Sequence, residues 1–144
     1  MTTTNIVCTV SVEIKALITK VWKALIEPEQ IKKYLFGTNT VCDWKVGSPI
    51  KFSGVWDGKP YEDKGTILAI EPEKLLTYTY WSNFSGKPDL PENYQVVTYK
   101  VRSEKDKTIF DLIQENCPSE EAKEHSAGNW NMVLSSLKEM LEEK

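Results

Sequence analysis

The side chains that could carry chemistry in this sequence are few and widely separated. His125 is the only histidine, so any Ser–His–Asp or Cys–His arrangement would depend on it. Helical spacing from Trp130 passes back through Ser126 and Ala122, which places His125 beside this stripe and favours a solvated histidine over a catalytic base. The sequence has no HxxxH or HExxH spacing, so it predicts no metal site.

Carboxylates and thiols are the next candidates. Asp111 and Glu115 fall on one face of an expected strand, and either face of that strand is compatible with the inward position. A carboxylate pair for general acid–base catalysis is one interpretation, and solvated strand charges are the favoured one. The three cysteines, Cys8, Cys42 and Cys117, form no CxxC pattern, so we expect small hydrophobic residues or inert thiols.

Charge and hydropathy exclude several classes of partner. The 144 residues contain 18 basic and 21 acidic side chains, which gives a net charge of −3 and no basic footprint for nucleic acid. No apolar run reaches the roughly 18–20 residues of a membrane-spanning helix. The first residues lack the basic region of a signal peptide, so a cytoplasmic location is expected. No motif indicates a cofactor.

The elements that must position these residues follow from hydrophobic periodicity. Alternation predicts strands, and apolar residues three and four apart predict helices. The expected order is a strand at Ile6–Ile14, two short helices at Leu17–Ile26 and near Ile31–Leu35, strands at about 38–46, 50–56, 59–70, 75–81, 94–102 and 108–116, and a long helix from Ser119 to about Leu141. The fold class is therefore α+β, with one domain over residues 1–144 and an antiparallel sheet of about six to seven strands curled around the last helix.

Aromatic residues are concentrated on these strands and on the last helix. A packed core is one interpretation of them, and a cavity is the other. The cavity is supported by a mismatch along the last helix, whose stripe is large from Trp130 onwards but small at Ala122 and Ser126. Small side chains facing a curved aromatic sheet would leave space for a mostly apolar ligand. The residues expected to line it are Trp44, Phe52, Trp56, Tyr78, Tyr80, Tyr99, Ser126 and Trp130.

Several short stretches together resemble a known family. They are Val21-Trp22-Lys23-Ala24-Leu25 followed by Glu27-Pro28-Glu29, then Val46-Gly47, Gly65-Thr66-Ile67, Ile70-Glu71-Pro72 and Asn129-Trp130. On these residues the chain resembles the family related to the C-terminal domain of the activator of heat-shock protein 90 ATPase, in the START-like superfamily. The resemblance implies a helix-grip fold, in which a curved antiparallel sheet holds the C-terminal helix with an apolar cavity between them.

Three functions remain compatible with the sequence. The first is a non-enzymatic protein that binds an apolar or amphipathic small molecule, as the resemblance implies. The second is a stand-alone interaction module for a protein partner such as a chaperone, although the chain is too short to contain the separate N-terminal domain of the namesake co-chaperone. The third is an enzyme of unknown reaction that uses the same cavity, since some START-like relatives carry out aromatase or cyclase chemistry there.

Overall fold

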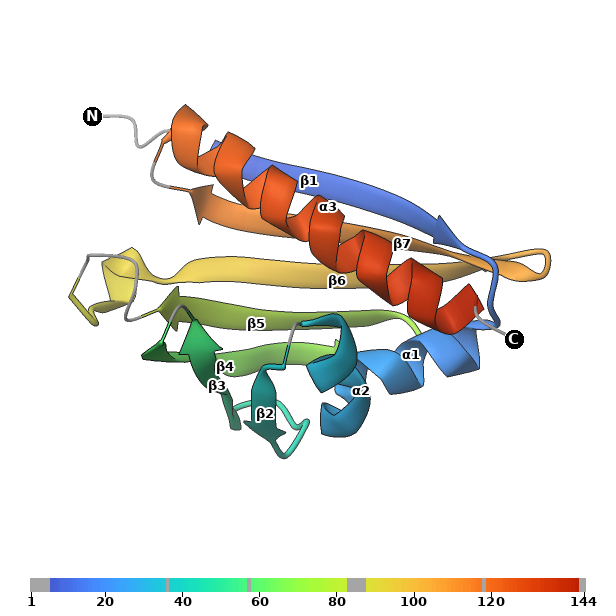
Figure 1. Ribbon diagram of the computed structural model, residues 1–144, viewed down its shortest axis with the longest axis horizontal. Helices are drawn as coiled ribbons and strands as arrows, with labels where there is room; N and C mark the ends of the chain where they lie inside the picture. The colour runs from blue at the N-terminus through green and yellow to red at the C-terminus, as the bar shows by residue number, and fades with distance from the viewer. Residues whose placement is uncertain (1–5, 36, 57, 83–87, 118, 143–144) are drawn as a thin grey trace.

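The computed structural model describes residues 6–35, 37–56, 58–82, 88–117 and 119–142, without the side chain of Trp56. Its elements, shown in Figure 1, are β1 (Ile6–Ile14), α1 (Ile18–Ile26), α2 (Pro28–Tyr34), β2 (Asn39–Cys42), β3 (Pro49–Trp56), β4 (Lys59–Glu71), β5 (Leu75–Ser82), the short 3-10 helix η1 (Pro91–Asn93), β6 (Gln95–Glu104), β7 (Lys107–Cys117) and α3 (Glu120–Glu142). The predicted α+β class and helix-grip architecture are confirmed.

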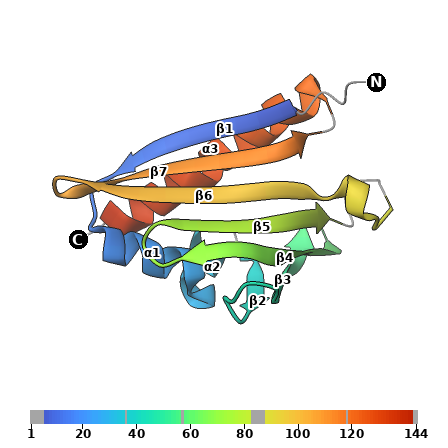
Figure 2. The same ribbon diagram turned by 180° about the vertical axis from the view of Figure 1, so that it is seen from behind.

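The strands of the described ranges form one antiparallel sheet in the order β1-β7-β6-β5-β4-β3-β2. From β2 to β7 each strand pairs with its successor in the chain, as is typical of antiparallel sheets, and the longest of these connections is the one from β5 to β6, which contains η1. The exception is β1, which is joined to β2 through α1 and α2 and pairs with β7 instead. The helices α1, α2 and α3 lie on one face of this sheet, and Figure 2 shows the sheet in front of them from the other side.

One half of the inner face of the sheet is a closely packed apolar core. Inward positions alternate along β1 and β7, so that Ile14 and Phe110 are fully buried. Val21 of α1 and Leu137 of α3 are completely buried from the helical side. Cys8 of β1 is 1% exposed and packs in this core, in line with the small hydrophobic role expected for it.

The long helix α3 is attached to the rest of the molecule mainly through its C-terminal half. Its start is capped, since the Ser119 hydroxyl accepts a hydrogen bond from the backbone N–H of Ala122 at 3.0 Å. Near its end, the Lys138 ammonium donates to the carbonyl of Glu13 at 2.7 Å, and the Lys20 ammonium donates to the carbonyl of Leu141 at 2.8 Å. Within the described ranges, neither this helix nor another is long and apolar enough to cross a membrane.

The strand expected to continue to Val46 ends at Cys42 instead. Trp44 has a φ of 58°, a left-handed conformation that breaks the extended chain. The chain then turns through Gly47, whose backbone N–H donates to the carbonyl of Ile67 on β4 at 2.8 Å. Alternation across Cys42, Trp44 and Val46 was therefore not the alternation of a strand, and Trp44 approaches the core from a turn.

Candidate functional site

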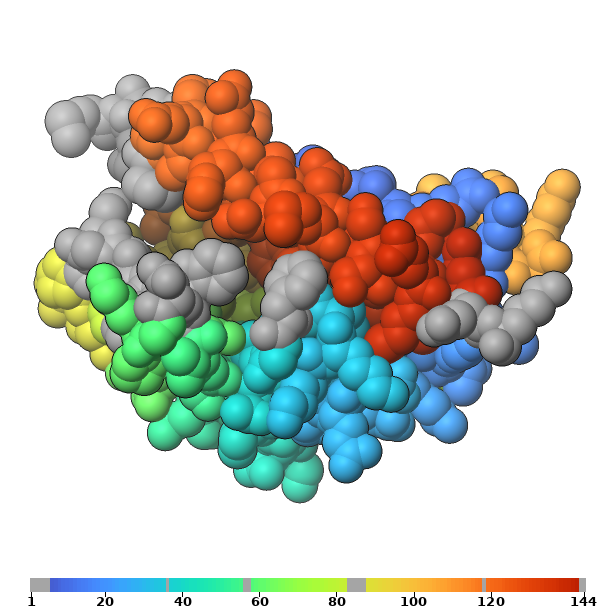
Figure 3. All heavy atoms as spheres, in the orientation of Figure 1, coloured from blue at the N-terminus to red at the C-terminus, as the bar shows by residue number. Residues whose placement is uncertain are grey.

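A cavity of about 420 Å³ lies between the inner face of the sheet and the N-terminal half of α3. Figure 3 shows the hollow between the orange start of α3 and the green β3–β4 region. Pockets for small molecules typically have volumes of about 300–1,000 Å³, so the space is large enough for a ligand. Its walls are formed by Leu35, Thr38, Phe52, Asp63, Tyr78, Tyr80, Ser82, Gln95, Tyr99, Gln114, His125, Ser126, Asn129, Trp130 and Val133.

Aromatic rings from three strands and the helix make up much of this wall. The ring centroids of Phe52 and Tyr78 are 5.8 Å apart, and those of Tyr99 and Trp130 are 6.3 Å apart. Tyr78 and Tyr99 meet edge to face, with their hydroxyl oxygens 2.7 Å apart. Burial raises the pKa of Tyr99 to about 12, so its hydroxyl is neutral at physiological pH. The wall is therefore apolar in its body and carries neutral hydroxyls.

A row of polar side chains crosses the sheet at the end of its inner face where the cavity lies. Asp63 on β4 is paired with Ser82 on β5, and Tyr80, two residues before Ser82, is paired with Gln95 on β6. Gln114 continues the row on β7. Because directly paired residues of neighbouring strands point to the same face, these side chains all line the cavity. The cavity thus has a polar strip along an otherwise aromatic wall.

The carboxyl group of Asp63 is the most unusual member of this polar row. The Tyr80 hydroxyl donates a hydrogen bond to its Oδ2 at 2.5 Å. Burial raises the pKa of Asp63 above its ordinary value, and hydrogen bonds from Ser82 and Tyr80 oppose that rise. Its other oxygen, Oδ1, is buried and has no hydrogen-bond partner within the described part of the chain. A buried acceptor in that state is costly and points to a missing partner.

Gly65 explains how the backbone reaches this arrangement. A Cβ atom at this position would lie 1.6 Å from the carbonyl oxygen of Thr79, so no other residue fits without moving β4 or β5. The neighbouring backbone N–H of Thr66 donates to the Thr79 hydroxyl at 2.8 Å in place of a regular ladder bond. This close approach lies beside the Asp63–Tyr80 contact and fixes the spacing of the two strands there.

Gln114 connects the polar row to the helix. Its side-chain oxygen accepts a hydrogen bond from Trp130 Nε1 at 2.8 Å, and its side-chain nitrogen donates to Gln95 Oε1 at 2.6 Å. Gln114 is 5% exposed, so its side-chain amide is largely removed from water at the centre of these two bonds. The contact holds the indole of Trp130 against the sheet and closes the cavity toward the packed half of the core.

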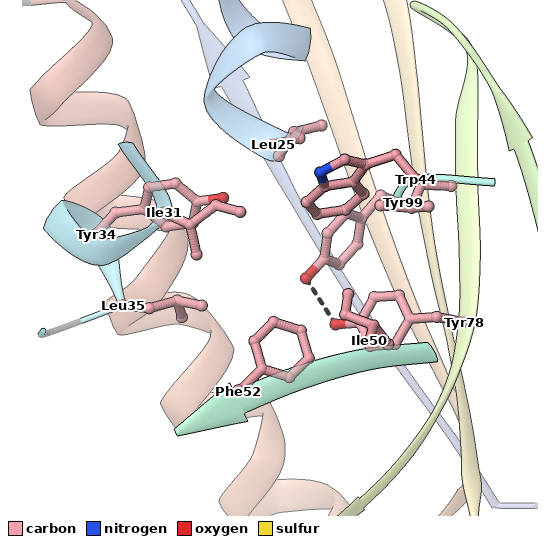
Figure 4. A pocket seen from close by; sticks show the side chains of 10 residues that line it. Leu25, Ile31, Tyr34, Leu35, Trp44, Ile50, Phe52, Tyr78 and Tyr99 are labelled. Atoms are coloured by element: carbon pink, nitrogen blue, oxygen red, sulfur yellow. Dashed lines mark hydrogen bonds between the residues drawn. The ribbon is translucent and has the colours of Figure 1, made fainter. Parts of the chain in front are cut away.

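A much smaller void adjoins the cavity behind a shared wall. It has a volume of about 10 Å³, roughly the space of one water molecule. Leu35, Phe52, Tyr78 and Tyr99 line both spaces. Figure 4 shows this void with Trp44 beside Tyr99 and the hydrogen bond between the two tyrosine hydroxyls. Trp44 therefore lies at the small void and not at the large cavity.

The structure brings together six of the residues expected to line a cavity: Phe52, Tyr78, Tyr80, Tyr99, Ser126 and Trp130. Trp44 is placed at the neighbouring void, and the side chain of Trp56 lies outside the described part of the chain. His125 is exposed and contributes to the cavity wall at the start of α3. Asp111 is not among the lining residues, and its carboxylate accepts a hydrogen bond from Ser11 at 2.5 Å.

Sequence reasoning missed the polar row. Asp63 shares its face of β4 with the buried residues Gly65 and Ile67, so period-two alternation extended back from Ile67 would have indicated its inward position. A charged residue at an inward position between Glu62 and Lys64 was the available signal. Within the described ranges, no group of three or more His, Cys, Asp or Glu side chains could hold a metal ion.

Comparison with protein families gives an extensive match. The family model described as "Activator of Hsp90 ATPase homolog 1-like protein" matches residues 15–142. This range includes the whole described cavity wall, from Leu35 to Val133. Among curated proteins, none matches the chain.

Solved structures share the fold over nearly the whole chain. The solution structure of ChR145 from Cytophaga hutchinsonii is 48% identical, with a TM-score of 0.83, and the match covers 95% of this chain and 94% of that one. The Aha1 dimer from Colwellia psychrerythraea is 20% identical, with a TM-score of 0.76 and coverage of 95% and 96%. DynU16, a protein of the dynemicin biosynthetic locus, is 16% identical, with a TM-score of 0.78 and coverage of 94% and 47%.

Proposed function

The chain belongs to the Activator of Hsp90 ATPase homolog 1-like family, and we propose that it binds a small apolar or amphipathic molecule in the cavity between the sheet and α3. The observation that carries this proposal is the cavity itself, which has a volume of about 420 Å³ and a wall rich in aromatic rings. Aromatic walls with a few fixed polar groups are typical of small-molecule sites.

The polar groups of the wall indicate that the cavity is a binding site and not a packing defect of the core. Protein interiors are close-packed, and each methyl-sized void lowers stability. Here the space coincides with Asp63, Gln95 and Gln114, residues whose polar atoms are expensive to bury. A sequence selected only for stability would fill such a space with apolar side chains. A space kept open beside buried polar groups is better explained by an occupant.

The proposal is tested with N-phenylnaphthylamine, a neutral dye that fluoresces in apolar surroundings. We expect saturable binding with one site per chain for the wild-type protein. Ser126→Leu, which fills the cavity from α3, should abolish this binding. Ser135→Leu is the matched control, because Ser135 is exposed on the same helix and should leave binding unchanged. Native mass spectrometry of freshly purified protein would detect a co-purified ligand. Unaltered dye binding by Ser126→Leu would contradict the proposal.

An enzyme acting in the same cavity is the second candidate, and Asp63 is the observation that favours it. A carboxyl group whose pKa is raised by burial, in contact with a tyrosine hydroxyl at 2.5 Å, has the properties of a general acid or base. Any ligand that co-purifies should then change its mass on prolonged incubation with wild-type protein but not with Asp63→Asn. A ligand recovered unchanged from both proteins would leave binding as the function.

The outer face of the sheet gives less support to a function as a protein-interaction module. The outer face does carry exposed apolar residues, including Val41, Val55 and Leu68. However, Val41 lies directly opposite Lys51, and the residues two and four positions before Leu68 on β4 are Thr66 and Lys64. Interaction surfaces typically need a contiguous apolar patch, and these side chains are scattered singly.

A further inference from the structure

We propose that the occupant of the cavity is a cationic amphiphile, an apolar body carrying an ammonium group that pairs with Asp63. This inference rests on the proposed binding function and adds the chemical class of the ligand. It depends on three features of the cavity: its charge, the state of the Asp63 carboxyl and the rings around that carboxyl.

The charge of the wall is unbalanced. Asp63 is the one carboxylate among the described lining residues, and none of those residues is Lys or Arg. The nearest cation in sequence, Lys64, points to the other face of β4, where it pairs with Asp89 and lies 5.6 Å from the ring centre of Trp81. His125 lies across the cavity on α3 and is exposed. The carboxyl group therefore has no cationic partner within the described part of the protein.

The hydrogen bonding of Asp63 is also incomplete. Tyr80 donates to Oδ2, whereas Oδ1 is buried without a donor in the described ranges. Carboxylates removed from water are stable only when paired and hydrogen-bonded. An ammonium group offers three donors and a positive charge, so it would supply both missing contributions at once. Burial raises the pKa of Asp63, and a cation beside the carboxyl group would lower that pKa and favour the charged form.

Aromatic faces near Asp63 favour a cation further. The rings of Phe52 and Tyr80 have centroids 6.4 Å apart, and Phe52 also contacts Tyr78 at 5.8 Å. Cations are attracted to ring faces within about 6 Å of the centroid. An anionic ligand would be repelled by Asp63, and no Lys or Arg among the described lining residues would offset that repulsion. Carboxylates and sulfonates are therefore expected to bind poorly.

The test uses three compounds with one body: para-butylbenzylamine, para-butylbenzyl alcohol and para-butylbenzoic acid. Each competes with N-phenylnaphthylamine for the wild-type protein at neutral pH. We expect the amine to bind about tenfold or more tighter than the alcohol, because a charge-assisted hydrogen bond is stronger than a neutral one. The acid should bind weakest. An alcohol that binds as tightly as the amine would overturn the inference while leaving the proposed function intact.

Asp63→Asn keeps the size of the side chain and removes its charge. We expect the amine to lose its advantage over the alcohol when the two affinities are compared within this variant. Glu62→Gln is the matched control, because Glu62 is the exposed neighbouring carboxylate on the other face of β4 and its removal should preserve the ranking. A retained amine preference in Asp63→Asn would overturn the inference, as would its loss in Glu62→Gln. Failure of the dye and all three compounds to bind would instead overturn the proposed function.

Discussion

The two ends of the inner face of the sheet are built from the same strands and the same helix, yet only one of them is filled. At the packed end, Leu137 and Leu141 of α3 are almost completely buried, and Phe110 is buried beneath the helix. At the open end, α3 presents Ser126 and Asn129, and the strands present Asp63 and other polar side chains.

The difference shows how one fold separates stability from binding. Large apolar side chains on α3 fix the helix at its C-terminal half, where the helix is also tied by Lys138 and Lys20. Once the helix is held there, its other half keeps its distance from the sheet without filling side chains beneath it. Burial of apolar area supplies most folding free energy, so a cavity is tolerated where that contribution is already made elsewhere.

The largest effect is expected from truncation at the packed end. Leu137→Ala should lower the free energy of unfolding by about 2–5 kcal/mol, because it leaves a cavity in a filled core. Chemical denaturation measures this loss. At a denaturant concentration where the variant is still folded, dye binding should be unchanged. A loss below about 1 kcal/mol would show that the C-terminal half of α3 is not the region that fixes the helix.

Substitution by a larger side chain should change stability in opposite directions at the two ends of the inner face. Ser126→Leu adds apolar area to an existing space and should stabilise the protein by up to about 1–2 kcal/mol. Ala24→Leu, at a fully buried position of α1, should overpack the core and destabilise by about 1–3 kcal/mol. Thermal melts of the two variants resolve the sign. Destabilisation by Ser126→Leu would mean that the open end is filled in solution.

A smaller effect should appear in the pH dependence of stability. The pKa of Asp63 is raised in the folded protein above its ordinary value of 3.8, so the folded state binds this proton more tightly than the unfolded state. Stability from this group is therefore lost as pH rises from the unfolded pKa through the folded one. Asp63→Asn lacks this loss, so its stability relative to wild type should increase over that pH range and then level off. A difference that is constant with pH, measured by urea denaturation, would contradict the raised pKa.

The smallest effect is expected at His125. This residue is exposed at the start of α3, so His125→Gln should change the free energy of unfolding by less than about 0.5 kcal/mol. Dye affinity should remain at the wild-type value, because the imidazole adds little to a wall made of buried rings. A clear loss of affinity at unchanged stability would show that His125, at the edge of the cavity wall, contacts the ligand directly.

Much of this architecture could be predicted from local hydrophobic periodicity in the sequence. Period-two alternation placed Phe52, Tyr78 and Tyr99 on inward faces, and helical spacing identified the change from small to large side chains between Ser126 and Trp130. These patterns are local, and backbone geometry converts them directly into a direction for each side chain. Alternation failed at Trp44, because the left-handed backbone conformation of this residue ends the extended chain. No residue before Trp44 indicates that change.

The polar row required information that no single strand contains. Asp63, Gln95 and Gln114 each look like an ordinary polar residue near a strand end. They become one feature only through register, which aligns them across β4 to β7 at the same end of the sheet. Register depends on turns and bulges, such as the irregularity between Ile67 and Ala69, which a sequence pattern does not specify.

The attachment of α3 at one end has a kinetic consequence. The amides of the N-terminal half of the helix can open without breaking the contacts of Lys138 or Leu137, and exposed Gly128 lowers helix stability between the two halves. A bound molecule would then leave through local opening of residues 120–130, on a timescale separate from global unfolding. Its residence time should follow the hydrogen-exchange rates of those amides and be insensitive to the unfolding rate of the whole protein.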